Sequence, residues 1–290
     1  MRIIMVPVAD RPECAVALES AFSVAEHLGA NVQAVHIRPH RYSRVVLPAE
    51  ASYTLSLSSM PKLSEADSKS AAAASKAARA LASRLAEARD FRLVRSLDGS
   101  STRCLVWNED VGHVENLMPV IGPFADLIAV TRPRKAGSKV ARLFMTEALL
   151  HSSRPVLILP PGHKVQPGRR IVIGWDNTRH AMRSVVAALP FLARADAVTI
   201  ATSGPGKPHG AKPGQLVKYL KAWGIKPELE RARGARNDAV ADLVAACEHR
   251  AADLLVVGSY SRSRFREYIF GGVTDYMLHR APLPVFMTSD

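Results

Sequence analysis

The chain has few cysteines and no long apolar run, and each shortage excludes a class of protein. Its three cysteines, Cys14, Cys104 and Cys247, lie far apart without a CxxC pair, which argues against a disulfide framework or a zinc knuckle. No apolar stretch approaches the roughly 20 residues that span a membrane. The first ten residues do not have the pattern of a signal peptide. We therefore expect a cytoplasmic protein without a membrane partner.

Paired histidines and clustered charge are also missing. The 10 histidines form no HxxxH or HExxH pair, so we expect no metal site of the protein's own. Lysine and arginine outnumber the acidic residues by 39 to 26, giving a formal net charge of +13, but they are spread over both halves with few aromatic residues between them. Such a surface attracts polyanions weakly, and we expect no specific binding of nucleic acid.

What the chain does have is a globular composition and a regular alternation of strand and helix patterns. Apolar residues make up 48% and charged residues 22% of 290 residues, enough to bury the core of one large or two average domains. The expected strands are Arg2–Val8, Asn31–Ile37, Phe91–Leu97, Asp126–Thr131, Pro155–Leu159, Arg170–Trp175, Ala197–Thr202, Pro227–Arg231, Leu254–Val257 and Pro284–Met287. The expected helices are Cys14–Gly29, Ser64–Arg89, Ser138–Ser152, Thr178–Arg194, Gly214–Trp223, Asn237–Arg250 and one that begins at Gly271.

The pattern occurs twice, which indicates an internal duplication. Asp126-Leu-Ile-Ala-Val in the first half matches Asp253-Leu-Leu-Val-Val in the second, and both are followed by a strand that begins with proline. We expect a domain over residues 1–160 with an insertion at about 40–62, a linker over 161–169 and a second domain over 170–290. Nearly continuous apolar strands between helices predict parallel sheets with helices on both faces, which bind ligands at the carboxyl ends of the strands.

The segment from Gly258 to Thr274 is the strongest candidate for a binding site. A buried strand ends at Gly258, a basic loop follows, and Gly271-Gly272 opens a helix. Unpaired backbone amides at the start of a helix carry partial positive charge, and consecutive glycines let a phosphate approach them without obstruction. Close packing of the helix on the sheet is the alternative reason for the two glycines.

This corner resembles the signature of the universal stress protein family. The family has a glycine, two residues, a second glycine, nine residues, and then Gly-Ser or Gly-Thr. Here Gly258, Ser261, Gly271 and Gly272 take the four positions, so the spacing is kept and two of the four residue types match. Asp176 after the first strand of the second half is also typical of the family. The resemblance covers residues 170–290 and, more weakly, residues 1–160.

The resemblance implies tandem flavodoxin-like domains of the HUP type, each with five parallel strands. It also implies ATP or another adenine nucleotide, with magnesium accompanying it, bound once per chain in the second domain. By this analogy Asp176 faces the adenosine and the helix start holds the phosphates, with arginine and serine side chains of the loop adding contacts. The candidate nucleotide-binding residues are Asp176, Val257, Gly258, Ser261, Arg262, Ser263, Gly271, Gly272 and Val273.

The departures from the family pattern predict a weak or altered site. A serine at position 261 costs about 1–2 kcal/mol if the backbone there needs a positive φ. The first half has Thr131 where the second has Gly258, Arg134 where it has Ser261, and Phe144-Met-Thr-Glu before its last helix. We therefore expect no nucleotide in the first half. In this family closing strands pair between domains, so Pro155–Leu159 could meet Pro284–Thr288, and a homodimer is expected as well.

Three functions remain open at this point. The first is a nucleotide-binding stress or regulatory protein, and the second is a nucleotide-free scaffold that acts through dimerisation and partner binding. The third is a slow ATPase, for which the sequence offers no catalytic constellation. His180 could transfer a proton, although Asp176 or Thr178 as a helix cap is the simpler interpretation of that loop. The glycine- and lysine-rich stretch 203–212 lacks the order of a P-loop and is expected to be a surface loop or a lid.

Overall fold

Strands and helices alternate along the chain, as the apolar patterns predict. The computed structural model describes residues 1–9, 11–38, 65–133, 139–162, 168–202, 211–231, 238–258 and 272–288. The strands are β1 Ile3–Pro7, β2 Asn31–Arg38, β3 Arg92–Val94, β4 Cys104–Val111, β5 Leu127–Thr131, β6 Val156–Leu159, β7 Arg170–Gly174, β8 Ala197–Thr202, β9 Glu228–Arg231, β10 Leu254–Gly258 and β11 Val285–Thr288. The helices are α1 Pro12–Leu28, α2 Glu65–Glu87, α3 Val114–Ile121, α4 Lys139–His151, α5 Arg179–Leu192, α6 Pro213–Ala222, α7 Ala239–His249 and α9 Gly272–His279, with a 3-10 turn at Gly122–Phe124.

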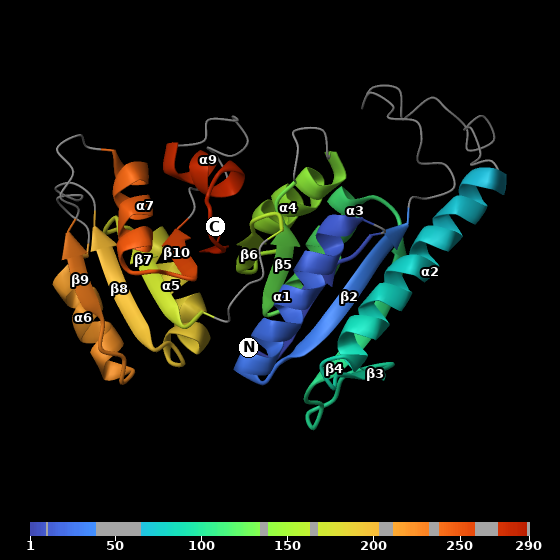
Figure 1. Cartoon of the computed structure of the whole chain (residues 1–290), viewed down its shortest axis with the longest axis horizontal. Coiled ribbons are helices and arrows are strands. Elements are labelled where there is room, and N and C mark those ends of the chain that lie inside the picture. Colours follow the sequence, from blue (N-terminus) through green and yellow to red (C-terminus); the bar gives the residue numbers. More distant parts are fainter. Residues whose placement is uncertain are drawn as a thin grey trace.

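All the strands belong to one mostly parallel sheet (Figure 1). Its order is β3-β4-β2-β1-β5-β6-β11-β10-β7-β8-β9, so the first half of the chain supplies one side and the second half the other. Among the described strands, neighbours are parallel within each half, and the pair β6 and β11, which joins the halves, is antiparallel. The predicted α/β, flavodoxin-like fold class is confirmed.

Each face of the sheet has its own apolar core, because successive strand residues point to opposite sides. Side chains of α1, α2, α5 and α6 form one core with strand residues such as Ile4 and Ile173. Side chains of α3, α4, α7 and α9 form the other with residues such as Met5 and Val172. Helices therefore cover both faces in both halves, as expected for parallel strands.

The described residues of the first half form six strands, so the expectation of five is wrong there. The sequence prediction placed the third strand at Phe91–Leu97 and passed over β4 and α3. In the structure β4 pairs along its whole length with β2, and the three-residue β3 lies outside it at the sheet edge. Only the first residues of β4 are buried, and the later Asn108-Glu109-Asp110 gives the strand a loop-like composition. The insertion at 40–62 lies outside the described residues.

Two aspartates make equivalent contacts in the two halves. Asp126 accepts hydrogen bonds from the backbone amides of Arg2 and Ile3, at 2.6 and 3.0 Å. Asp253 does the same for the backbone amides of Arg169 and Arg170, at 3.0 and 3.2 Å. Each carboxylate thereby holds the start of the first strand of its half. Asp126, just before β5, holds β1, and Asp253, just before β10, holds β7. Burial raises the pKa of Asp253, and these backbone hydrogen bonds lower it.

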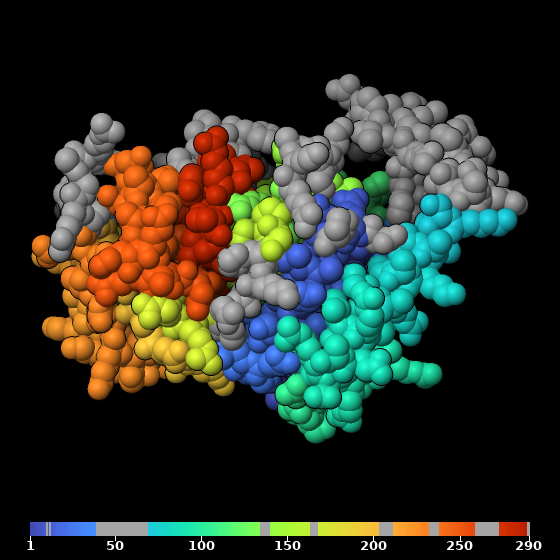
Figure 2. Space-filling model, viewed as in Figure 1, coloured from blue at the N-terminus to red at the C-terminus, as the bar shows by residue number. Residues whose placement is uncertain are grey.

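The junction between the halves combines strand pairing with one buried arginine. In the β6–β11 ladder Val156 lies opposite Met287 and Ile158 opposite Val285. Arg132, which is 7% exposed and follows β5, donates through Nη2 to the backbone oxygen of Ala281 beyond α9, at 2.6 Å. Burial lowers the pKa of Arg132, while Tyr276 raises it. Figure 2 shows the red C-terminal residues directly against yellow-green residues of the first half.

Candidate functional site at the carboxyl ends of β7 and β10

The two best-placed predicted site residues follow neighbouring strands. β7 and β10 are paired, with Gly174 opposite Val257, so the loop after β7 and the residue that ends β10 lie at the same sheet edge. Asp176 is exposed in that loop, Val257 is buried in the strand, and Gly258 is partly exposed. The carboxyl edge of a parallel sheet is where such folds bind ligands. The structure thus brings Asp176 and Gly258 to one edge.

Asp176 is occupied by a local network that starts α5. Its Oδ1 accepts from the backbone amide of Thr178 at 3.1 Å and from the Thr178 hydroxyl at 2.6 Å. Thr178 in turn caps α5, its oxygen accepting from the backbone amide of Ala181 at 3.2 Å. Asn177 between them has a φ of 64°, a left-handed conformation that asparagine tolerates better than most residues. The cap is Thr178, and Asp176 orders the loop before it with one carboxylate oxygen.

Gly258 has no room for a side chain. A Cβ built on it would lie 2.5 Å from the backbone nitrogen of Ala181 and 2.7 Å from the carbonyl carbon of His180. Both atoms belong to the first turn of α5, so the helix backbone rests directly on the end of β10. The glycine at this signature position is therefore required by packing. That requirement exists whether or not a phosphate approaches the loop after it.

The glycine pair that was expected to bind phosphate is only partly described. Gly272 is the first residue of α9, and Val273 follows it and packs against the core of α7 and α9. A helix start at this place is what the sequence predicted, since its first amides have no partner within the helix. Ser261, Arg262, Ser263 and Gly271 lie outside the described residues, as does most of the 203–212 stretch.

Two hydroxyl contacts support the site, that of Thr178 with Asp176 and that of Ser184 with Thr288, and neither contact was predicted from the sequence. Thr178 was recognised only as a candidate cap. Ser184, fully buried in α5, lies 2.7 Å from the hydroxyl of Thr288. Thr288 is paired with Gly258 across β10 and β11, so this contact ties the helix to the strand beside the glycine. A buried serine on an otherwise apolar helix face was the available signal for Ser184.

The same place in the first half is closed by side chains. Thr131, which ends β5, donates its hydroxyl to the backbone oxygen of Glu13 in the first turn of α1, at 3.0 Å. Cys14 Sγ accepts from the backbone amide of Ala9 at 3.2 Å. The hollow between these residues and Phe144 has a volume of about 40 Å³.

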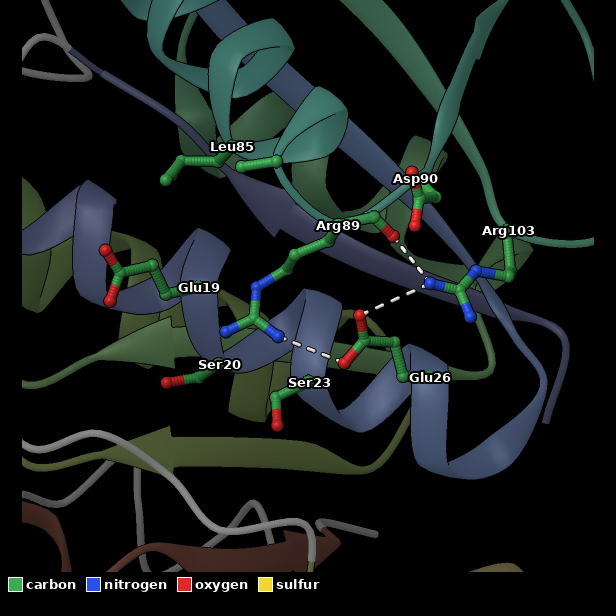
Figure 3. A pocket seen from close by; sticks show the side chains of 9 residues that line it. Glu19, Ser20, Ser23, Glu26, Leu85, Arg89, Asp90 and Arg103 are labelled. Atoms are coloured by element: carbon green, nitrogen blue, oxygen red, sulfur yellow. Dashed lines mark hydrogen bonds and ion pairs between the residues drawn. The ribbon is translucent and has the colours of Figure 1, made fainter.

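A larger, charged hollow of about 500 Å³ lies between α1 and the end of α2 (Figure 3). Its arginines are engaged: Arg89 pairs with Glu26 at 3.0 Å, and Arg103 lies 3.5 Å from Glu26 and donates to the backbone oxygen of Arg89 at 2.6 Å. Glu19 projects from α1 into the same region. Because Glu26 pairs with both guanidinium groups and Glu19 and Asp90 add negative charge to the lining, this hollow is a weaker candidate for an anion site than the edge at Gly258.

Neither a metal cluster nor a membrane segment is found in the described part of the chain. No group of three or more histidine, cysteine, aspartate or glutamate side chains could hold an ion among those residues. No helix within the described ranges is long and apolar enough to cross a membrane.

Known proteins share both the fold and part of the sequence pattern. Residues 168–289 match the model of the Universal stress protein family. A universal stress protein from Archaeoglobus fulgidus DSM 4304 aligns over 99% of this chain and 98% of its own, with a TM-score of 0.70 and 14% identity. A protein of unknown function from Pseudomonas aeruginosa PAO1 covers 100% of this chain and 92% of its own, with a TM-score of 0.56 and 12% identity. No curated protein matches. Residues 168–289 thus match the universal stress protein family, and the solved structures show that the fold extends over the whole chain.

Proposed function

We propose that the chain is a tandem universal stress protein that binds one adenine nucleotide weakly in its second half and acts in the cytoplasm as a stress or regulatory protein. Asp176 and Gly258 at one sheet edge are the observation that carries this proposal. In this function the loop after β7 contacts the adenosine and the first amides of α9 hold phosphate oxygens, with magnesium accompanying the nucleotide. The loop residues Ser261, Arg262, Ser263 and Gly271 complete the site.

In the proposed architecture the two halves are separate domains, 1–160 and 170–290, joined by the linker 161–169. The β6–β11 pairing would hold them together as an internal pair, and the first domain would act as a structural partner. Homodimers of the whole chain would then use other surfaces, because these two edges are already paired.

The nucleotide proposal is tested with two aspartates introduced at matched places. Gly272 and Lys139 are the first residues of the last helix in each half. An aspartate at either position favours the helix electrostatically, but at 272 it repels phosphate. We expect millimolar ATP to raise the Tm of the wild-type chain and of K139D, and not of G272D. Equal shifts in all three would place the nucleotide elsewhere.

Two further measurements define the site. Mass spectrometry of small molecules released by heating the purified protein should detect an adenine nucleotide. Finding none, together with no thermal shift in ATP, would reject the first proposal. Ser261→Gly should tighten binding if backbone strain or crowding by the serine is what weakens it. An unchanged affinity would show that this serine is not the limit.

A nucleotide-free scaffold is the second candidate, and the contacts of Gly258 and Asp176 favour it. Packing against α5 already accounts for the glycine, and capping of α5 already engages the aspartate. Both residues would then be kept for the fold alone. A slow ATPase remains a third proposal, and phosphate release that is proportional to the protein and absent in G272D would support it.

A further inference from the structure

The outer face of α5 carries an exposed apolar groove of about 710 Å³. Met182, Val186 and Ala187 of the helix line it, together with Ala211 just before α6, and Arg179 and Arg183 stand beside them. Val186 leaves 47% of its surface exposed. These residues face away from Gly258, because that glycine touches the backbone of Ala181 on the buried side of the helix. Asn177 and Thr178 also line the groove, so it adjoins the loop after β7, while its α5 residues lie on the opposite side of the helix from Gly258.

The first half shows what such a face looks like when the chain covers it. Thr131 meets Glu13 where Gly258 meets His180, so α1 and α5 can be aligned turn by turn. In this alignment Val186 of α5 corresponds to Glu19 of α1. The 23-residue α2 covers α1 and buries Ala78, Ala82 and Ala86 in the common core. The corresponding helix α6 has only 10 residues.

The corresponding residues of the two helices differ in polarity, and the apolar residue is on the helix that is less covered. Glu19, beneath α2, is charged and lies in the hollow of Figure 3. Val186, which the shorter α6 leaves exposed, is apolar. Met182 and Ala187 are partly buried against the core and Val186 is exposed, and an apolar groove rimmed by charge is typical of an interaction surface. Since α2 packs along α1 beside that hollow in the first half, a helix also fits along α5.

The charges at the groove indicate what kind of helix would bind there. Arg179 and Arg183 are four residues apart and so lie on one side of α5, beside Met182 and Val186. A second copy of the chain would bring the same arginines and a net charge of +13 to the contact, which repels. We propose that this groove binds an amphipathic helix of an acidic partner protein, with its apolar stripe on Met182 and Val186 and its carboxylates beside Arg179 and Arg183.

The test uses the full chain and a designed peptide, because the partner is unidentified. The probe is a fluorescent, lactam-bridged helix of about 18 residues, long enough to be helical, with leucines on one face and glutamates beside them. Its control has lysines in place of the glutamates. We expect saturable binding of the acidic peptide by fluorescence anisotropy, and at least about tenfold weaker binding of the basic one. Equal affinities, or no binding of the acidic peptide, would overturn the proposal.

Matched variants locate the binding. Val186→Glu, which places the residue type of Glu19 in α5, should weaken the acidic peptide at least about tenfold. Val120→Glu, on α3 where Val120 is 61% exposed, should leave affinity unchanged. Both sites are exposed, so urea unfolding should show both variants folded. Equal loss in both would overturn the proposed location.

Other occupants give distinct results. A concentration-dependent dimer of the wild type that V186E abolishes would assign the groove to a second copy. Peptide binding that appears only after residues 203–210 are deleted would assign it to the chain's own loop. Either result would overturn the proposal of an acidic partner.

Discussion

Gly258 and Thr131 occupy the same position in the two halves and make opposite contacts with the helix that follows the first strand. At Gly258 the absence of a side chain lets the backbone of α5 rest on the strand end. At Thr131 the side chain is present and donates a hydrogen bond to α1. One half thus fixes the helix by close approach of backbone atoms, and the other by a polar side chain. The difference shows that a glycine at a signature position can be required for packing as well as for ligand binding.

The helix starts differ in the same way. α5 is capped by Thr178, whereas Arg11 at the cap position of α1 makes no side-chain capping bond. Two other features support the start of α1. Pro12 at the first helical position has no amide that needs a partner, and Thr131 donates a hydrogen bond to the first turn. The second half therefore depends more strongly on the residues at this edge.

Changing Gly258 to threonine should have the largest effect. The new side chain would meet backbone atoms of Ala181 and His180, which cannot rotate away as a side chain could. We expect G258T to lower the free energy of unfolding by about 3 kcal/mol, measured by urea denaturation. The reverse exchange, Thr131→Gly, should cost less because it removes a contact without creating a clash. Equal stability of G258T and wild type would mean that α5 is not held so close to β10.

Removing the cap of α5 should have the next largest effect. Thr178→Ala leaves the amide of Ala181 without its acceptor. It also removes the hydroxyl that donates a hydrogen bond to Asp176 and helps to position that carboxylate. We expect a loss of about 1 kcal/mol in unfolding free energy. Thr178→Ser keeps the hydroxyl and should recover most of it. A similar loss in the serine variant would point to the methyl group and not to capping.

Giving α1 the cap that it lacks should stabilise the first half. Arg11 has an extended backbone, with φ −151° and ψ 144°, which suits a capping serine. We expect Arg11→Ser to raise the free energy of unfolding by about 0.5–1 kcal/mol. Arg11→Ala is the control, since it removes the same charge without adding an acceptor. If both variants behave alike, the charge and not the cap is responsible.

His27 offers the smallest effect and links the two halves. It lies in the last turn of α1, and charged residues of the second half surround it. Burial lowers the pKa of His27 most, Arg194 and Arg169 lower it further, and Asp196 and Asp253 raise it. Because the folded-state pKa is below the ordinary value of 6.5, the unfolded chain binds the proton better. The contribution of neutral His27 to the free energy of unfolding should therefore be fully present above pH 6.5 and be lost as the pH decreases below it.

The check is urea unfolding of the wild type and of His27→Gln between pH 7.5 and pH 5. The variant should lose less stability over this range than the wild type. Identical pH profiles would show that His27 does not take part.

Much of the fold could be predicted from sequence, because local patterns determined it. The apolar runs of β5 and β10 marked buried strands, and Gly29, with a φ of 68°, ends α1 where the sequence placed the helix stop. β4 could not be predicted in this way. Its polar end is held as a strand by pairing with β2, where Ile37 lies opposite Asp110 and Arg38 forms an ion pair with Glu109. Such contacts connect residues far apart in sequence and leave no local pattern.

The contacts within the candidate site could not be predicted from the sequence either. The sequence identified Asp176, Thr178 and Gly258 as residues of interest, and the structure places all three at one edge. Their partners could not be predicted, because the closeness of Gly258 to Ala181 depends on how α5 packs across the sheet. The buried pair Ser184 and Thr288 has the same origin. The nucleotide contacts of the site stay predictions.

The bond from Arg132 to Ala281 also has a consequence for folding kinetics, because it joins residues 149 positions apart in the chain. Contacts of such long range carry a large loop-closure cost and tend to form late. Each half can complete its own parallel ladder before β6 meets β11. We expect refolding to show an early phase for each half and a later docking phase, which Arg132→Met slows while the early phases keep their rates.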